Sequence, residues 1–143
     1  MAIVLSIAGC SLTSCSATKP SEPIRTIQIQ QSWQLQPGDE VGGHPVVAGL
    51  GDISIDLNGS NVYAPFNGLV QPTTGGCILF SSAEVPAYLF RLCGLNQPLL
   101  GEVSAGTAIG SGEYLHFATL RRQPEGTWTI VEPAKGILQR ILK

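Results

Sequence analysis

Few side chains in this sequence could perform catalysis. The chain has two histidines, His44 and His116, and four cysteines. Hydroxyls such as Ser104 and the Ser81-Ser82 pair have no histidine placed to activate them as nucleophiles. The cysteine spacings match neither a zinc ribbon nor a CxxC redox motif. Metal or acid–base chemistry would therefore have to use the two histidines and nearby acidic residues.

The four cysteines sort into two pairs along the chain. Cys10 and Cys15 lie near the start, whereas Cys77 begins one apolar run and Cys93 ends the next. The polar turn between these runs is centred near Glu84, so a hairpin about that centre places Cys77 opposite Cys93. Opposed residues on antiparallel strands lie close enough for a disulfide. We expect that disulfide if the protein is exported, and two separate buried thiols otherwise.

The N-terminal segment has the composition of an export leader. The apolar and small residues before Cys10 end in Ile-Ala-Gly-Cys, which resembles a bacterial lipobox, where cleavage precedes a lipid-carrying cysteine. Residues 11–23 are rich in Ser, Thr and Pro, which is typical of a flexible tether. We predict a leader and tether over residues 1–23, with Cys10 as the lipidation site, and one domain over residues 24–143. The alternative is a frayed hydrophobic N-terminus.

The composition points to a folded domain of short strands and turns. Charged residues make up 13% of the chain and hydrophobic residues 43%, with 17 glycines and 10 prolines. A disordered chain would combine low hydrophobicity with high net charge. The formal net charge of −2 and the scattered basic residues give no reason to expect nucleic-acid binding.

Strand-like segments recur throughout the domain. They show period-two alternation of apolar and polar residues, and turn signals such as Asn58-Gly59 separate them. The only predicted helix covers residues 133–143, where apolar residues recur at helical spacing after Pro133. The predicted fold is therefore all-β, built of short antiparallel strands as a sandwich or barrel, with one short C-terminal helix packed on the sheet. The predicted strands are residues 26–30, 32–36, 41–48 (interrupted by two glycines), 53–57, 61–64, 68–71, 77–80, 87–93, 99–103, 106–110, 114–120 and 127–131.

Six segments, taken in order, resemble the LytM/lysostaphin-type domains, which are β-sheet peptidoglycan endopeptidases with a barrel-sandwich hybrid (duplicated hybrid motif) architecture. The resemblance covers about residues 44–140. The matching segments, with the family patterns, are residues 62–70 (V-x-A-P-x-x-G-x-V), 76–80 (G-x-x-V-x-I), 88–92 (Y-x-x-H-L), 103–110 (V-x-x-G-x-x-I-G), 115–117 (H-L-H-F-E) and 131–133 (V-D-P).

The resemblance implies a zinc hydrolase whose chemistry has decayed. The family's zinc is held by an H-x-x-x-D motif and by the second His of H-x-H, while two further histidines serve the attacking water and the transition state. His116 matches the second His of H-x-H, but Tyr114 and Arg91 stand where the two further histidines should be. Arg91 could not act as a base near neutral pH and would repel zinc. A metal site of His44, Asp52 and His116 stays open as an alternative, although the spacing of the first two departs from H-x-x-x-D.

The expected function is therefore a non-catalytic module of the cell envelope without a cofactor. Its groove would be floored by Arg91, Tyr114 and His116 and would hold peptidoglycan or an envelope protein such as a cell-wall amidase. Arg91 could then pair with a ligand carboxylate. The expected location is extracytoplasmic, either secreted or anchored to the membrane through lipid on Cys10. The alternatives are a divergent zinc endopeptidase acting on peptidoglycan cross-links and a lipoprotein scaffold without a pocket.

Overall fold

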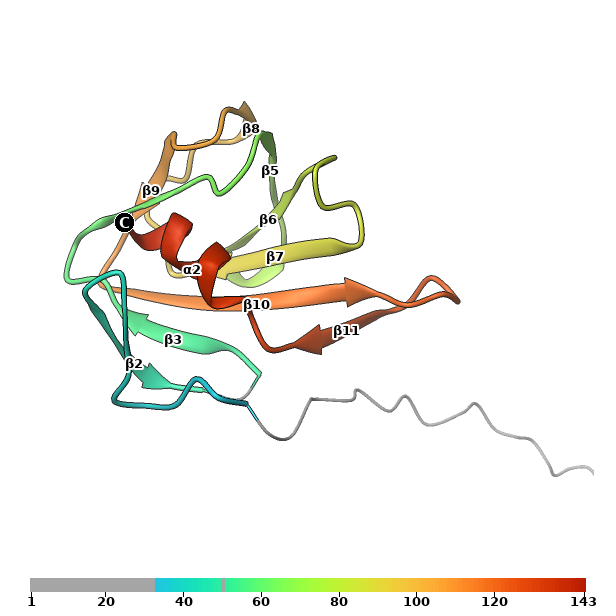
Figure 1. Cartoon of the computed structure of the whole chain (residues 1–143). Coiled ribbons are helices and arrows are strands. Elements are labelled where there is room, and N and C mark those ends of the chain that lie inside the picture. Colours follow the sequence, from blue (N-terminus) through green and yellow to red (C-terminus); the bar gives the residue numbers. More distant parts are fainter. Residues whose placement is uncertain (1–32, 50) are drawn as a thin grey trace, which may run out of the picture.

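The computed structural model describes residues 33–49 and 51–143, which form a curved antiparallel sheet and a short C-terminal helix (Figure 1). The all-β prediction is confirmed. The described part of the chain contains one α-helix, α2 (Lys135–Leu142), and eleven strands: β1 (Glu40–Val41), β2 (His44–Ala48), β3 (Ile53–Asp56), β4 (Asn61–Tyr63), β5 (Gly68–Pro72), β6 (Cys77–Ser81), β7 (Tyr88–Cys93), β8 (Gly101–Val103), β9 (Ala108–Ser111), β10 (Tyr114–Arg122) and β11 (Trp128–Val131).

The main sheet has the strand order β1-β2-β3-β10-β7-β6-β5-β8, with β11 paired to one end of β10. The long strand β10 is its centre, because β3, β7 and β11 all pair with it. Strands β4 and β9 form a separate antiparallel pair. Every strand pairing in the described residues is antiparallel. The pairing of β3 with β10 places residues distant in sequence directly opposite each other.

The inner face of the sheet holds the hydrophobic core. Period-two alternation buries Leu115 and Phe117 of β10 completely and leaves Tyr114 and His116 exposed on the other face. The rings of Phe80, Phe90 and Phe117 form a chain of contacts across three neighbouring strands, with centroids 6.3 Å and 5.9 Å apart.

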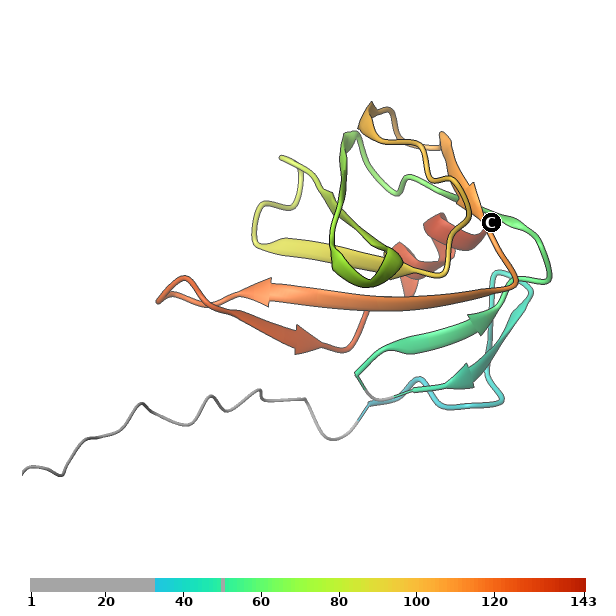
Figure 2. The same cartoon turned by 180° about the vertical axis from the view of Figure 1, so that it is seen from behind.

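The C-terminal helix packs against the inner side of the protein, as predicted. Leu138, Ile141 and Leu142 are buried in the core, and α2 contacts β4 and β1. Seen from opposite sides, α2 lies in front of β7 in Figure 1 and behind the strands in Figure 2. The helix begins two residues after Pro133, because Ala134 keeps an extended backbone as its N-cap.

The predicted hairpin and disulfide are confirmed. Strands β6 and β7 pair antiparallel with Cys77 opposite Cys93, and the two residues form a disulfide. Its sulfurs lie on the face opposite the core, because the adjacent Ile78 and Leu92 are buried inward. Disulfides of this kind are typical of proteins in oxidising, extracytoplasmic compartments.

One predicted strand is wrong in its described part. Residues 33–36 alternate in burial, with Trp33 and Leu35 inside the core, but they form no strand. The backbone N–H groups of Gln34 and Leu35 donate to the side-chain carboxylate of Glu132, at 2.8 Å each, instead of to a neighbouring strand. The predicted strand 26–30, the 23/24 domain boundary and the Cys10 lipidation site lie outside the described residues.

Gly68, at the start of β5, is required by close packing. A Cβ atom at this position would overlap the carbonyl oxygen of Ser81 and the ring of Phe80. We expect Gly68→Ala to lower the free energy of unfolding by about 1–3 kcal/mol, as overpacking does, measured by urea denaturation. Gly136→Ala is the matched control, because its methyl group meets open space in a helix, where Ala is favoured. Equal stability of the two variants would contradict the close approach of β5 and β6.

Candidate binding face

The side of the main sheet that faces away from the core is called here the outer face. Residues paired across strands share a face, so the register defines its rows. One row runs across β3, β10, β7 and β6 as Ser54, His116, Cys93 and Cys77. The second row crosses β10, β7, β6 and β5 as Ala118, Arg91, Leu79 and Gln71. The third row crosses β7, β10 and β11 as Leu89, Leu120 and Ile130.

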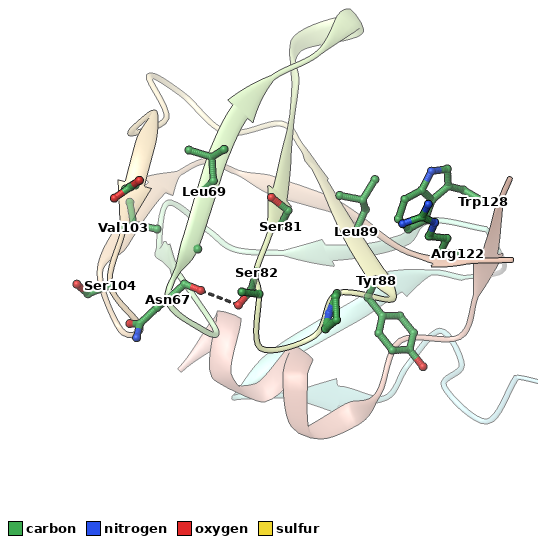
Figure 3. A pocket seen from close by; sticks show the side chains of 14 residues that line it. Asn67, Leu69, Ser81, Ser82, Tyr88, Leu89, Val103, Ser104, Arg122 and Trp128 are labelled. Atoms are coloured by element: carbon green, nitrogen blue, oxygen red, sulfur yellow. Dashed lines mark hydrogen bonds between the residues drawn. The ribbon is translucent and has the colours of Figure 1, made fainter. Parts of the chain in front are cut away.

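Two depressions lie on the outer face. The larger, of about 780 Å³, is drawn in Figure 3. Leu69, Ser81 and Leu89 lie side by side on β5, β6 and β7 in its middle, and Arg122 lies beside Trp128 at one end (Figure 3). At the other end are loop residues before β5 and after β8. The complete lining is Asn67, Gly68, Leu69, Ser81, Ser82, Ala83, Pro86, Tyr88, Leu89, Glu102, Val103, Ser104, Arg122 and Trp128.

The smaller depression, of about 440 Å³, adjoins the larger one, because Leu89 and Trp128 line both. It includes the disulfide and the predicted groove residue Arg91. Its lining is Asp52, Thr73, Thr74, Cys77, Leu79, Leu89, Arg91, Cys93, Leu120 and Trp128. Together the two depressions cross the sheet from the start of β3 to β8.

Arg91 is engaged within the protein. One of its terminal nitrogens donates to the Asp52 carboxylate at 2.6 Å, and both side chains are about one third exposed. Its Nε atom is buried without a partner among the described residues. An ion pair this exposed to water stabilises the fold by less than about 1 kcal/mol. Its local effect is to neutralise the cation that was expected to meet a ligand carboxylate.

His116 and Tyr114 lie on the same face as Arg91 but line neither depression. The Nδ1 atom of His116 is hydrogen-bonded to the Ser54 hydroxyl at 2.8 Å. Tyr114 is 49% exposed and stands opposite Asp56. The structure therefore brings the three predicted groove residues onto one face, with only Arg91 inside a hollow.

The structure does not bring the three residues of the alternative zinc site together. His44 pairs with Val41, which is buried in the core, so the imidazole lies on the core side of the sheet and not on the outer face with His116. Asp52 is held by Arg91, and a guanidinium disfavours a bound cation. Within residues 33–49 and 51–143, no three or more His, Cys, Asp and Glu side chains gather in a group that could hold a metal ion.

Sequence reasoning missed the residues that shape the hollows. Trp128, Arg122 and Glu102 line the larger depression, and none of them is among the predicted site residues. Trp128 stands opposite Arg122 and is 37% exposed. The available signal was alternation in β11, where Trp128 and Ile130 share a side that the register assigns to the outer face.

Comparison with known proteins gives no match, either to a protein-family model or to a curated protein. Among the described helices, none has the length and apolar character needed to cross a membrane.

Proposed function

We propose that the chain is a non-catalytic, LytM-like module of the cell envelope that binds peptidoglycan on its outer face. The observation that carries the proposal is the pair of adjoining depressions on that face, joined through Leu89 and Trp128. Such hollows, with apolar walls and a few polar groups, are typical of ligand sites. The disulfide, typical of exported proteins, supports an extracytoplasmic location for the module.

The ligand class rests on the order of the sequence motifs. The positions that match the family's zinc and catalytic motifs lie on the outer face, as Arg91, Tyr114 and His116. Arg91 and His116 already have internal partners, Asp52 and Ser54. A face with this arrangement is suited to holding a ligand without cleaving it, because Tyr114 and Arg91 occupy the positions of the two histidines that serve the attacking water and the transition state in the family.

Co-sedimentation with purified peptidoglycan sacculi tests the proposal. We expect the wild-type chain to pellet with sacculi and Trp128→Ala to bind about tenfold more weakly or worse, because a buried tryptophan contact is a common centre of binding energy. Leu99→Ala is the control, since Leu99 is also an exposed large apolar residue, at 49%, and lines neither depression. Thermal unfolding of each variant separates lost binding from lost folding.

Two results would contradict the proposal. Equal retention of wild type and Trp128→Ala on sacculi, or no retention of either, would remove the outer face as the peptidoglycan site. Release of soluble peptides from sacculi, together with about one zinc retained per chain after desalting, would favour the endopeptidase alternative and remove the non-catalytic assignment.

A further inference from the structure

The larger depression carries opposite charges at its two ends. Arg122 of β10 lines one end, and Glu102 of β8 lines the other. Within the described residues, neither side chain takes part in a salt bridge, and the one ion pair there joins Arg91 to Asp52. The side-chain hydrogen bonds found in this part of the chain also leave Arg122 and Glu102 unused. Both charges are therefore available to a ligand.

The distance between the charged strands sets the length of that ligand. Strands β8 and β10 are four steps apart in the sheet, through β5, β6 and β7. Neighbouring strands lie about 4.8 Å apart, so the two backbones are separated by roughly 19 Å. An extended peptide advances about 3.3–3.6 Å per residue, so about five residues span this distance.

The floor of the groove between Arg122 and Glu102 suits a peptide ligand with small side chains. Leu69, Ser81 and Leu89 occupy successive strands along the crossing (Figure 3). The two leucines offer apolar contacts to methyl-sized groups, and the Ser81 hydroxyl can donate to or accept from a peptide group. Nothing along this line adds a third charge.

We infer that this groove binds an extended peptide of about five residues that crosses the strands, with a carboxylate at Arg122 and an ammonium group at Glu102. A guanidinium matches a carboxylate through two parallel N–H···O bonds, which fixes the direction of the peptide. The inference rests on the proposed function and deepens it, because it assigns the recognised part of the ligand to peptide and not to glycan. It also moves the carboxylate contact from Arg91, which Asp52 neutralises, to Arg122.

The test is an NMR titration of the ¹⁵N-labelled full chain with three synthetic probes: pentaalanine, its C-terminal amide and its N-acetylated form. We expect Arg122→Gln to weaken pentaalanine binding about fivefold. The C-terminal amide should bind Arg122→Gln as weakly as it binds the wild type, because it lacks the carboxylate that Arg122 would contact. Glu102→Gln should weaken pentaalanine binding about fivefold. The N-acetylated form should bind Glu102→Gln as weakly as it binds the wild type, because it lacks the ammonium group that Glu102 would contact. This pairing of each side chain with one end of the probe is the expected signature.

The control variants carry the same charge changes elsewhere. Arg121→Gln removes a neighbouring guanidinium whose position in β10 has the opposite parity, and Glu40→Gln removes an exposed carboxylate from β1 at the far edge of the sheet. Both should bind all three probes like the wild type. Losses of equal size for the three probes, or losses in the controls, would overturn the inference.

The two proposals fail separately. Binding to sacculi without binding to pentaalanine would overturn the peptide assignment and leave peptidoglycan recognition standing. Charge-paired binding of pentaalanine without binding to sacculi would support the peptide groove and overturn peptidoglycan as the ligand. If the chain bound neither sacculi nor pentaalanine, both the proposed function and the peptide groove would be overturned.

Discussion

Phe117→Ala is expected to lower the free energy of unfolding by about 3–5 kcal/mol, the range for truncating a buried phenylalanine. Phe117 is fully buried at the middle of β10 and stacks on Phe90 with ring centroids 5.9 Å apart. A domain of this size is stable by about 5–15 kcal/mol, so the variant should lose a substantial share of its stability. Urea denaturation followed by circular dichroism measures the change.

Two further variants make this result specific. Phe117→Leu keeps an apolar side chain in the site and should cost clearly less than Phe117→Ala. Leu120→Ala changes the same strand on the outer face, where the side chain is partly exposed, and should cost about 1 kcal/mol. If Phe117→Ala were as mild as Leu120→Ala, the assignment of the two faces of β10 would be wrong. The faces matter for function, because His116 and Ala118 flank Phe117 on the outer side.

Loss of the Cys77–Cys93 disulfide is expected to lower the free energy of unfolding by about 3 kcal/mol. The cysteines are 16 positions apart, and a crosslink over a loop of that size restricts the unfolded chain by about this amount. The measurement is urea denaturation with and without a reductant. The disulfide also lines the smaller depression with Arg91, so reduction should disturb this part of the outer face before the core.

The double variant Cys77→Ser/Cys93→Ser supplies the control. Its unfolding midpoint should match that of the reduced wild type and should not respond to reductant. A reductant-sensitive midpoint in the double variant, or an unchanged midpoint in the reduced wild type, would contradict a stabilising role for the crosslink.

The local alternation of apolar and polar residues, together with the turn signals, predicted most of the strands. Alternation in sequence matches the alternating burial at the start of β10, and Asn58-Gly59 does form the predicted tight turn after β3, with both residues at positive φ. The same logic failed at residues 33–36, where burial alternates as in a strand. Alternation reports which side chains are buried, but the hydrogen-bond partner there is the distant Glu132 carboxylate, and no local pattern carries that information.

On the outer face, too, the sequence determined some features and the tertiary structure others. The sequence by itself predicted Cys77 opposite Cys93, because both residues belong to one hairpin centred near Glu84, and the structure shows the disulfide. It also placed Arg91, Tyr114 and His116 on strands. Only the tertiary structure decided that Asp52 neutralises Arg91 across 39 positions, that His44 lies on the core side, and that Arg122 and Glu102 end one groove. The physical reason is that alternation sets the side of a strand on which a residue lies, whereas packing of the whole sheet sets which strands become neighbours.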